Sequence, residues 1–353
     1  MKSFLSSLLG KFKKEQIIGD IGPSETTGFR LLLVYVSGAL MFIFLFLTFF
    51  WSSEPDIFEV ADKAGYRTST NGEQLIVGYT TVKTTERLVE TLLNKSGGFL
   101  SNDVIPPSVF LDDMPAWEYG ALVQVRDMVS ALRNHMSRSQ SQSLENEFLK
   151  EAEPLFNNSH TRWLVPSAEG KYQGGLEMLT AYREAISQTD NPNAQFYARA
   201  DNLGAWLLLV EKRLGGLSQR LSASVGEARV NTDLSGDDAA KQSTSTSSHV
   251  LVKTPWMDID DNFYEARGAC WALIHLLKAV EVDFASVLEK KNARASLAQI
   301  IRELEATQQT VWSPMILNGS GFGFVSNHSL VMASYVSRAN AGLIDLRELL
   351  SKG

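Results

Sequence analysis

The chain has 353 residues, an ordinary apolar content and a net charge of −7, so it can bury the core of one large domain or two average ones. The first 30 residues carry a net charge of +2, and the remainder is therefore acidic. This acidity argues against nucleic acid as a partner, because nucleic-acid binding depends on neutralising phosphates. A single cysteine, Cys270, excludes an internal disulfide and a cysteine-based metal site.

Residues 1–30 are expected to form a basic, cytoplasmic, amphipathic segment. On a helical wheel, residues 2–14 divide into an apolar arc and a lysine-rich arc, which is typical of a helix lying in an anionic leaflet. A disordered basic tail is the alternative. The apolar arc consists of Phe4, Leu5, Leu8, Leu9 and Phe12.

Residues 31–51 predict a transmembrane helix. No charged residue interrupts them, and about 20 apolar residues cross a hydrocarbon core of about 30 Å. The stretch is long for a signal peptide and ends in Phe49, Phe50 and Trp51 rather than in a small-residue cleavage site. We therefore expect an uncleaved signal anchor with the lipid bilayer as one partner.

The charges that flank this span predict its direction. Lys11, Lys13, Lys14 and Arg30 precede it, and basic flanks stay in the cytoplasm. The expected location is a bacterial inner membrane crossed once, with the N-terminus in the cytoplasm and the C-terminal domain in the periplasm.

The residues after the span predict an all-α fold, in which the transmembrane helix is followed by a soluble multi-helix bundle. Four rows of apolar residues alternate spacings of three and four, as in helices that pack at a shallow angle. No comparable run alternates with period two, although a short strand near Leu75 to Tyr79 is possible. The rows run from Leu122 to Met136, Leu203 to Leu221, Ala266 to Val287 and Met332 to Leu350.

The soluble part is expected to contain two helical subdomains. Residues 222–249 are rich in Ser, Thr, Asp and Gly and lack apolar periodicity, which indicates a flexible loop or linker. Residues 52–221 would then form a first periplasmic subdomain, and residues 250–353 a second one that packs on it.

Three stretches carry a family resemblance. They are GGFLSNDVIPPSVFLDDMPAWEYGALVQVRD at 97–127, PWMDIDDNFYEARG at 255–268 and NGSGFGFVSNHSLVMASYVSRANAGLIDLREL at 318–349. They resemble the DUF2333 family of bacterial envelope proteins, found mostly in Gram-negative organisms. The resemblance implies an envelope location and transfers no catalytic residue.

One candidate metal site is an acidic group, Asp258, Asp260, Asp261 and Glu265. Its register fails as an EF-hand, because Phe263 replaces the glycine at position six and Ala269 the glutamate at position twelve. The favoured interpretation is carboxylates that cap the N-terminus of a helix. No metal or other cofactor is therefore expected.

The glycine-rich stretch 318–324, NGSGFGF, lacks the flanking residues of a P-loop or dinucleotide fingerprint. It could bind an anion before a helix capped by Ser326 or Asn327. The favoured interpretation is a tight turn that places Phe322 and Phe324 in the core.

Two further loops, 112–120 and 162–170, place aromatic residues beside carboxylates, as sugar-binding clefts do. Glu118 could act as a general acid if burial raised its pKa, and Asp113 is a second weak catalytic candidate. Trp117 and Trp163 are favoured as core residues instead. None of the five histidines has a metal-binding spacing.

Two functions remain open. The first is a non-enzymatic binding or scaffolding protein that is tethered to the membrane and binds another envelope protein or a cell-wall component. The second is a membrane-anchored periplasmic enzyme that acts on cell-wall glycan or peptide. A cleft with two convergent carboxylates would favour the enzyme, and an apolar surface patch would favour the binding protein.

Overall fold

The computed structural model describes residues 23–60, 76–139, 144–188, 194–230 and 249–352. The amphipathic helix expected at residues 2–14 lies outside this range, as does the middle of the expected linker. The chain forms two compact units, Met1–Trp51 and Ser52–Gly353.

The first unit contains α2 (Pro23–Trp51). Within it, Arg30–Trp51 is long and apolar enough to cross a membrane, with a mean hydropathy of 2.5. Two hydroxyls within it are satisfied locally, since Ser37 and Thr48 donate to the carbonyls of Val34 and Phe44. This is what a lipid environment requires, because no water is available there to hydrogen-bond a polar group.

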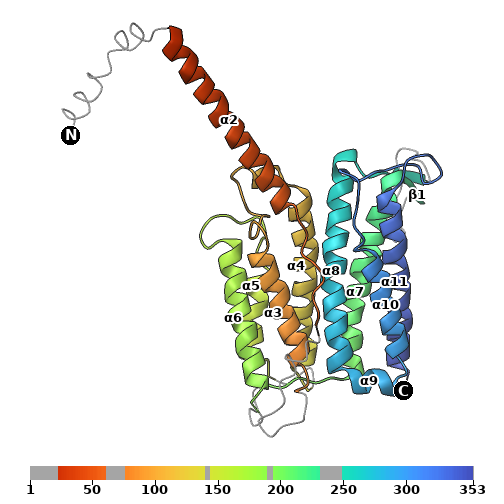
Figure 1. The fold of residues 1–353 in the computed structure, drawn as a ribbon. Helices are drawn as coiled ribbons and strands as arrows, with labels where there is room; N and C mark the ends of the chain where they lie inside the picture. Colours follow the sequence, from red (N-terminus) through yellow and green to blue (C-terminus); the bar gives the residue numbers. More distant parts are fainter. Residues whose placement is uncertain (1–22, 61–75, 140–143, 189–193, 231–248, 353) are drawn as a thin grey trace, which may run out of the picture. The chain divides into compact units, whose positions relative to one another are not determined.

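The second unit is a bundle of α-helices (Figure 1), so the all-α prediction is confirmed. The described helices are α3 (Tyr79–Asn94), α4 (Asp113–Ala131), α5 (Glu147–Phe156), α6 (Ala168–Ile186), α7 (Ala200–Ser222), α8 (Ile259–Asp283), α9 (Ala285–Lys290), α10 (Arg294–Ala306) and α11 (His328–Ser351). A π-helical turn, Leu132–Met136, continues α4.

The most extensive helix contact joins α4 to α8, and two glycines make it close. A Cβ on Gly120 would lie 2.0 Å from the carbonyl oxygen of Glu265, and one on Gly268 would lie 2.0 Å from that of Trp117. Each glycine therefore lies against the backbone of the opposite helix. Alanine at either position would force the two helices apart, and overpacking of this kind is destabilising.

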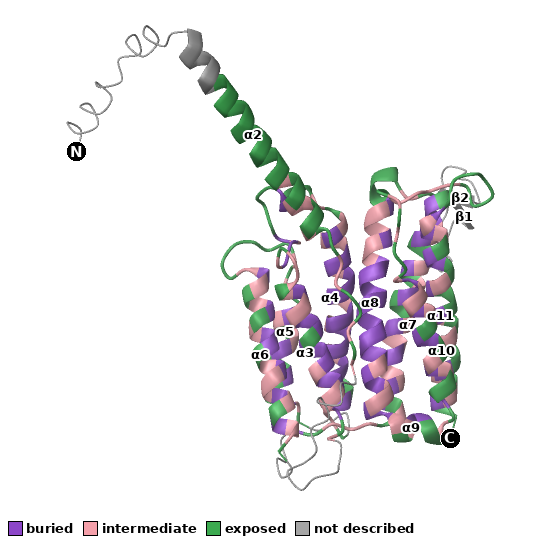
Figure 2. Ribbon diagram, in the orientation of Figure 1, coloured by how far each residue is buried: buried purple, intermediate pink, exposed green. Residues whose placement is uncertain are grey.

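The apolar rows face the core, as their spacing predicts (Figure 2). The contact of α7 with α11 and that of α10 with α11 bury the row of the last helix. Leu343 and Leu346 are fully buried in it. An amphipathic helix of this kind is held mainly by such packing rather than by its own propensity.

Side-chain caps fix several helix starts. The side-chain oxygens of Asn146, Ser167 and Asn327 accept hydrogen bonds from backbone N–H groups two or three residues into α5, α6 and α11. Such caps satisfy donors that the first helical turn leaves unpaired. The cap on α11 was predicted for Ser326 or Asn327, and Asn327 makes it.

One local expectation was wrong. Residues 76–78 form a turn and Tyr79 begins α3, so the described part of the expected strand near Leu75 is not extended. Segment 222–249 was predicted as a flexible loop or linker, and this stays a prediction. In the described residues at its two ends, β1 (Glu227–Val230) pairs with β2 (His249–Val252) in an antiparallel hairpin.

Helices from before and after segment 222–249 belong to the same compact unit, since α7 packs on α11. This contact agrees with the expectation that residues 250–353 pack on residues 52–221. A subdomain boundary at 222–249 stays a prediction.

Candidate functional site

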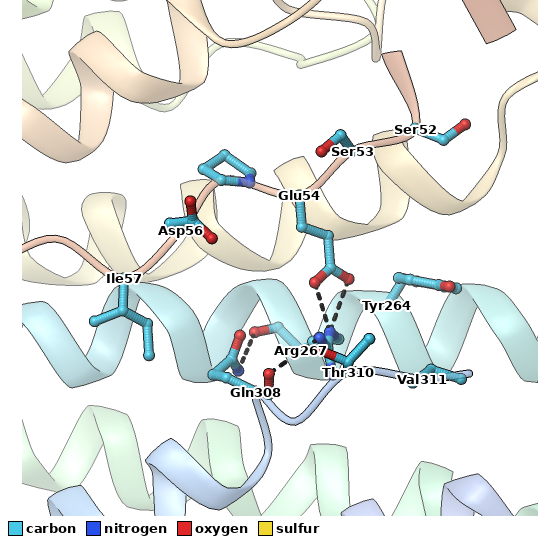
Figure 3. Close-up of a pocket in the computed structure, with 11 residues that line it drawn as sticks. Ser52, Ser53, Glu54, Asp56, Ile57, Tyr264, Arg267, Gln308, Thr310 and Val311 are labelled. Atoms are coloured by element: carbon cyan, nitrogen blue, oxygen red, sulfur yellow. Dashed lines mark hydrogen bonds and ion pairs between the residues drawn. The ribbon is translucent and has the colours of Figure 1, made fainter. Parts of the chain in front are cut away.

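The segment that follows α2 lies along α8 and forms one wall of a cavity (Figure 3). Both carboxylate oxygens of Glu54 lie 2.7 Å from Nε of Arg267. The indole N–H of Trp271 donates to the carbonyl of Asp56 at 3.2 Å, and the N–H of Phe58 donates to Nε2 of His275 at 3.0 Å. Every second residue of the segment thus meets every fourth residue of α8.

This pairing follows from the two backbone geometries. Two residues of extended chain advance about 6.6 Å, and four residues of α-helix advance about 6 Å. The contacts therefore stay in step over Glu54–Phe58. They also fix the direction of the segment, which runs from the first half of α8 into its second half.

Arg267 is the central residue of this wall. Its guanidinium is buried and also donates to the carbonyls of Thr307 and Gln309, at 3.0 and 2.7 Å. The amide of Gln308 donates back to the carbonyl of Arg267 at 3.1 Å. Arg267 therefore joins the entry segment, α8 and the chain after α10, and it serves to hold them together.

The cavity that these elements border is open to solvent on one side and has a volume of about 700 Å³, within the usual range for ligand sites. It is lined by Ser52, Ser53, Glu54, Pro55, Asp56, Ile57, Tyr264, Arg267, Gln308, Thr310 and Val311. All of them belong to the second unit.

Beside this cavity, carboxylates at the starts of α4 and α8 approach one another. Burial raises the pKa of Asp113 to about 7, and the negative charges of Asp112, Asp260 and Asp261 add to this effect. One oxygen of Asp113 is buried without a hydrogen-bond partner, as suits a protonated carboxyl. Asp113 therefore lies close to Asp260 and Asp261 of the acidic group, although the sequence suggested Asp113 and that group as two unrelated candidates.

The pKa values of Asp261 and of Tyr264, which lines the cavity, are raised by the same causes. Burial raises the pKa of Asp261 to about 6, assisted by the charges of Asp112 and Asp260. Burial also raises the pKa of Tyr264 to about 12, with Asp113 and Glu54 contributing. Carboxyl pKa values that are raised in this way occur both at functional sites and in structural clusters of acidic groups.

The acidic group divides between two neighbours. Asp260 and Asp261 interact with the carboxylates of α4, whereas Glu265 forms an ion pair with Arg220 of α7 at 2.6 Å. Asp258 occupies the N-cap position of α8 but makes no side-chain cap. Among the described residues, no three metal-binding side chains gather as a metal site would need.

Glu118 has a structural environment. It is fully buried, and its oxygens accept hydrogen bonds from the N–H groups of Leu100 and Ser101, both at 2.8 Å. The ammonium of Lys95 lies 2.8 Å away. Burial raises the pKa of Glu118, while Lys95 and these donors oppose the rise. The geometry shows a carboxylate that anchors the loop after α3, without access for a substrate.

Two aromatic predictions were wrong, and one is confirmed. Trp117 is fully buried between α4 and α8, next to Trp271. Trp163 is instead more than half exposed, and Phe322 and Phe324 are fully exposed.

The loop that carries the two phenylalanines is closed at its base, which turns its tip outward. The amide of Asn327 donates to Gly319 and Asn318, and the N–H of Gly319 donates to Ser326. A Cβ on Gly319 would meet the carbonyl of Val325 at 1.9 Å, so this position requires glycine. The glycines close the loop rather than bringing its aromatic residues into the core.

Sequence reasoning missed Glu54, Tyr264 and Arg267. The signal available was an arginine beside the apolar row of α8, next to Ala266 and three residues before Cys270. A buried arginine needs an anionic partner, but the sequence offers many carboxylates and no indication of which one pairs with it.

The comparisons with known proteins give a family and no relative of defined activity. No curated protein and no solved structure matches the chain. The family model described as an uncharacterised protein conserved in bacteria, DUF2333, matches residues 24–353. Because this match covers nearly the whole chain, the protein belongs to the DUF2333 family.

Proposed function

We propose that the protein is a membrane-tethered binding or scaffolding component of the bacterial cell envelope, with its helical unit in the periplasm. The observation that carries this proposal is the cavity beside Glu54 and Arg267. Its lining residues begin with Ser52, which directly follows the apolar helix in the chain. A site so close to its tether stays within reach of partners in the same layer, which raises their effective concentration.

The charges around the cavity suit a partner group that is cationic or donates hydrogen bonds. Glu54 is paired with Arg267, but Asp56 also lines the cavity and the carboxylates of Asp113 and Asp261 lie beside it. A lysine side chain or a free amine of a cell-wall peptide has this chemistry.

The periplasmic side rests on the basic residues before the span. Alkaline phosphatase and a fluorescent protein that folds only in the cytoplasm, fused in turn after Gly353, test it. An active phosphatase and a dark fluorescent protein are expected. The reverse pattern would overturn the orientation.

The binding site is tested by placing a photo-crosslinking amino acid at Thr310, which lines the cavity and is exposed. Glu184, which lies on α6, provides the control position. We expect one defined envelope adduct from position 310 and none from position 184, with the adduct weakened by Asp113→Asn. Equal labelling from both positions would remove the cavity as the binding site.

A second candidate function, an enzyme acting on cell-wall glycan or peptide, is favoured by one observation. Asp113 and Asp261 are two interacting carboxyls with pKa values raised to about 7 and about 6, which suits a general acid and a general base near neutral pH. Full-length protein in lipid nanodiscs, incubated with purified sacculi, would release soluble fragments, and Asp113→Asn would abolish the release. No release by the unaltered protein would exclude this function.

A further inference from the structure

The loops at one end of the bundle expose large apolar side chains. These loops, which we call the apolar loop end, are residues 99–112, 157–167, 252–258 and 311–327. In Figure 1 they lie at the end of the unit where α4, α6, α8 and α11 begin, and much of their surface is exposed (Figure 2). Their most exposed apolar residues are Val165, Trp256, Met257, Trp312, Phe322 and Phe324.

Hydrogen bonds hold these loops together in two pairs. The amide of Asn102 donates to the carbonyl of Arg162, which links the first loop to the second. The N–H of Thr254 donates to Ala223 at the end of α7, and the amide of Asn318 donates to neighbouring Ser224. The third and fourth loops thus meet at the same point.

The composition of the loop tips is as distinctive as their exposure. Residues 310–327 contain no Asp, Glu, Lys or Arg, and neither do residues 104–111, 163–168 or 254–257. Tryptophan favours the membrane–water interface, because its ring is apolar and its indole N–H is polar. Phenylalanine supplies the apolar face by which surface elements insert into the acyl boundary. The opposite end of the bundle exposes only Val77, Leu144 and Phe148 among its described large apolar residues.

The course of the chain identifies what this surface faces. Ser52 follows the last residue of the apolar helix, and the segment it begins meets α8 first at Arg267, in the first half of that helix, and later at His275, in its second half. The chain therefore enters the bundle at the apolar loop end. Each residue of an extended chain spans at most about 3.5 Å, so a short connection keeps that end of the bundle near the bilayer.

We propose that the apolar loop end binds the surface of the same bilayer that α2 spans, with its aromatic tips inserted among the lipid headgroups and upper acyl chains. The occupant is a lipid surface, rather than a second copy of the chain or a partner protein. The proposal rests on membrane tethering but not on which side of the membrane the bundle occupies. It adds a second, peripheral contact to the tether.

Site-directed spin labelling of the full chain in lipid nanodiscs tests this proposal. Cys270 is buried and is the only native cysteine, so an introduced cysteine provides the accessible thiol. Ser320→Cys reports on the apolar loop end, Asn134→Cys on the opposite end and Ser37→Cys on the span. We expect the label at 320 to lie about 5–10 Å below the lipid phosphates, as membrane-surface elements do, and the label at 134 to remain in water.

The three labels separate the possible failures. A deep label at 37 together with an aqueous label at 320 would overturn the membrane contact and leave the tether intact. Protection of 320 that appears only in discs holding two copies would assign the surface to a dimer and would also overturn the proposal. An aqueous label at 37 would contradict the tether itself, on which the membrane contact rests.

A matched variant adds a test of cause. Phe322→Ser with Phe324→Ser removes two side chains that make no core contact, so the fold should be retained. We expect the label at 320 to become several times more accessible to a water-soluble nickel reagent in this background. The paired change Val77→Ser with Leu144→Ser, at the opposite end, should leave that accessibility unchanged. Equal effects of the two pairs would contradict insertion.

Discussion

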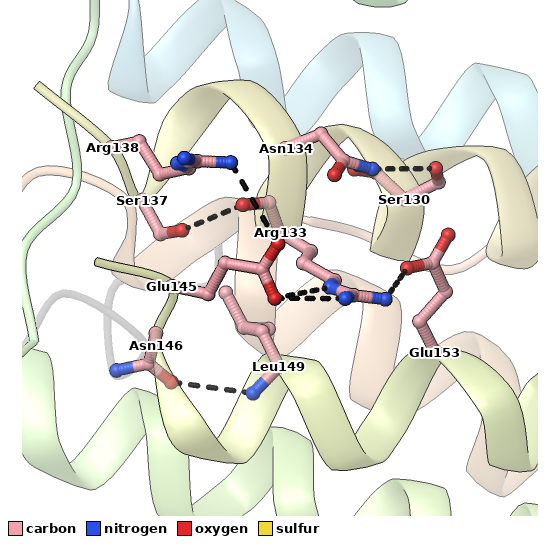
Figure 4. Close-up of polar contacts among 9 residues, drawn as sticks. All are labelled: Ser130, Arg133, Asn134, Ser137, Arg138, Glu145, Asn146, Leu149 and Glu153. Carbon is pink, nitrogen blue, oxygen red and sulfur yellow. Dashed lines mark hydrogen bonds and ion pairs between the residues drawn. The ribbon is translucent and has the colours of Figure 1, made fainter. Parts of the chain in front are cut away.

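The two ends of the helical bundle solve the same problem, the joining of successive helices, with opposite chemistry. At one end, Arg133 of the π-helical turn forms ion pairs with Glu153 at 2.6 Å and with Glu145 at 2.8 Å, as Figure 4 shows. At the other end the loops carry proline, glycine and exposed aromatic residues, and their tips, residues 104–111, 163–168, 254–257 and 310–327, contain no Asp, Glu, Lys or Arg. The ion-paired end is suited to water, whereas the apolar loop end is unfavourable there unless something covers it.

The core that connects the two ends should show the largest effect. Leu343→Ala with Leu346→Ala removes two fully buried side chains of α11, and each truncation costs about 2–5 kcal/mol because a cavity remains. We expect thermal unfolding of the detergent-solubilised protein to show a severely lowered midpoint. Glu348→Ala, at an exposed position of the same helix, should change the free energy of unfolding by less than about 0.5 kcal/mol. An unchanged midpoint in the double variant would mean that this helix face is not core.

The junction between the entry segment and α8 should be sensitive to acid. Burial lowers the pKa of His275 from 6.5 to about 4, so the unfolded state binds more protons than the folded state between these values. The contribution of His275 to the free energy of unfolding is therefore fully present above about pH 6.5. It falls by about 3 kcal/mol as the pH is lowered through 4.

Denaturant unfolding of the protein and of His275→Gln over this pH range isolates the effect, since other groups titrate in both. The difference between the two free energies of unfolding should shrink as the pH falls. A constant difference would show that folding does not shift the pKa of His275.

At the ion-paired end, Arg133→Ala should lower the free energy of unfolding by about 2 kcal/mol, because hydrogen bonds to charged groups contribute more than neutral ones. Glu153 would also be left partly buried without a partner. Arg199→Ala, which breaks a mostly exposed pair with Asp201, provides the control and should have an effect of at most about 1 kcal/mol. Equal losses would show that burial does not distinguish the two pairs.

The smallest effect is expected at the apolar loop end. Phe322→Ser with Phe324→Ser should change the unfolding midpoint in detergent very little, because surface substitutions stay within about 0.5 kcal/mol. The two ends would then differ clearly in their effect on the free energy of unfolding. Arg133→Ala at the ion-paired end lowers it, whereas the loss of two phenylalanine rings at the apolar loop end does not. A large loss in the aromatic variant would place these rings in the core after all.

These differences also explain which parts of the fold could be predicted. Helices α7, α8 and α11 follow from apolar residues spaced by three and four, because one buried face repeats with the helix. Phe322, Phe324 and Trp163 lie in loops, where no period shows which way a side chain points. Large apolar residues are usually buried, so the core was the natural but wrong expectation for these three.

The candidate site was predictable only in part. Asp113 and Asp261 were both named from the sequence, but their meeting depends on α4 packing against α8. That packing depends in turn on Gly120 and Gly268 lying against the opposite backbones, which no local pattern announces. The short helix α5 was missed because its ten residues offer too few turns for a clear apolar row.

The pairing of the entry segment with α8 has a mechanical consequence. The contacts at Glu54, Asp56 and Phe58 lie side by side along the helix axis, so a pull along that axis on the chain that leaves the membrane loads them together in shear. Contacts that were loaded one after another would break in sequence, each at a lower force. Tension applied to the chain before Ser52 would thus reach the long helix α8 through these three contacts at once.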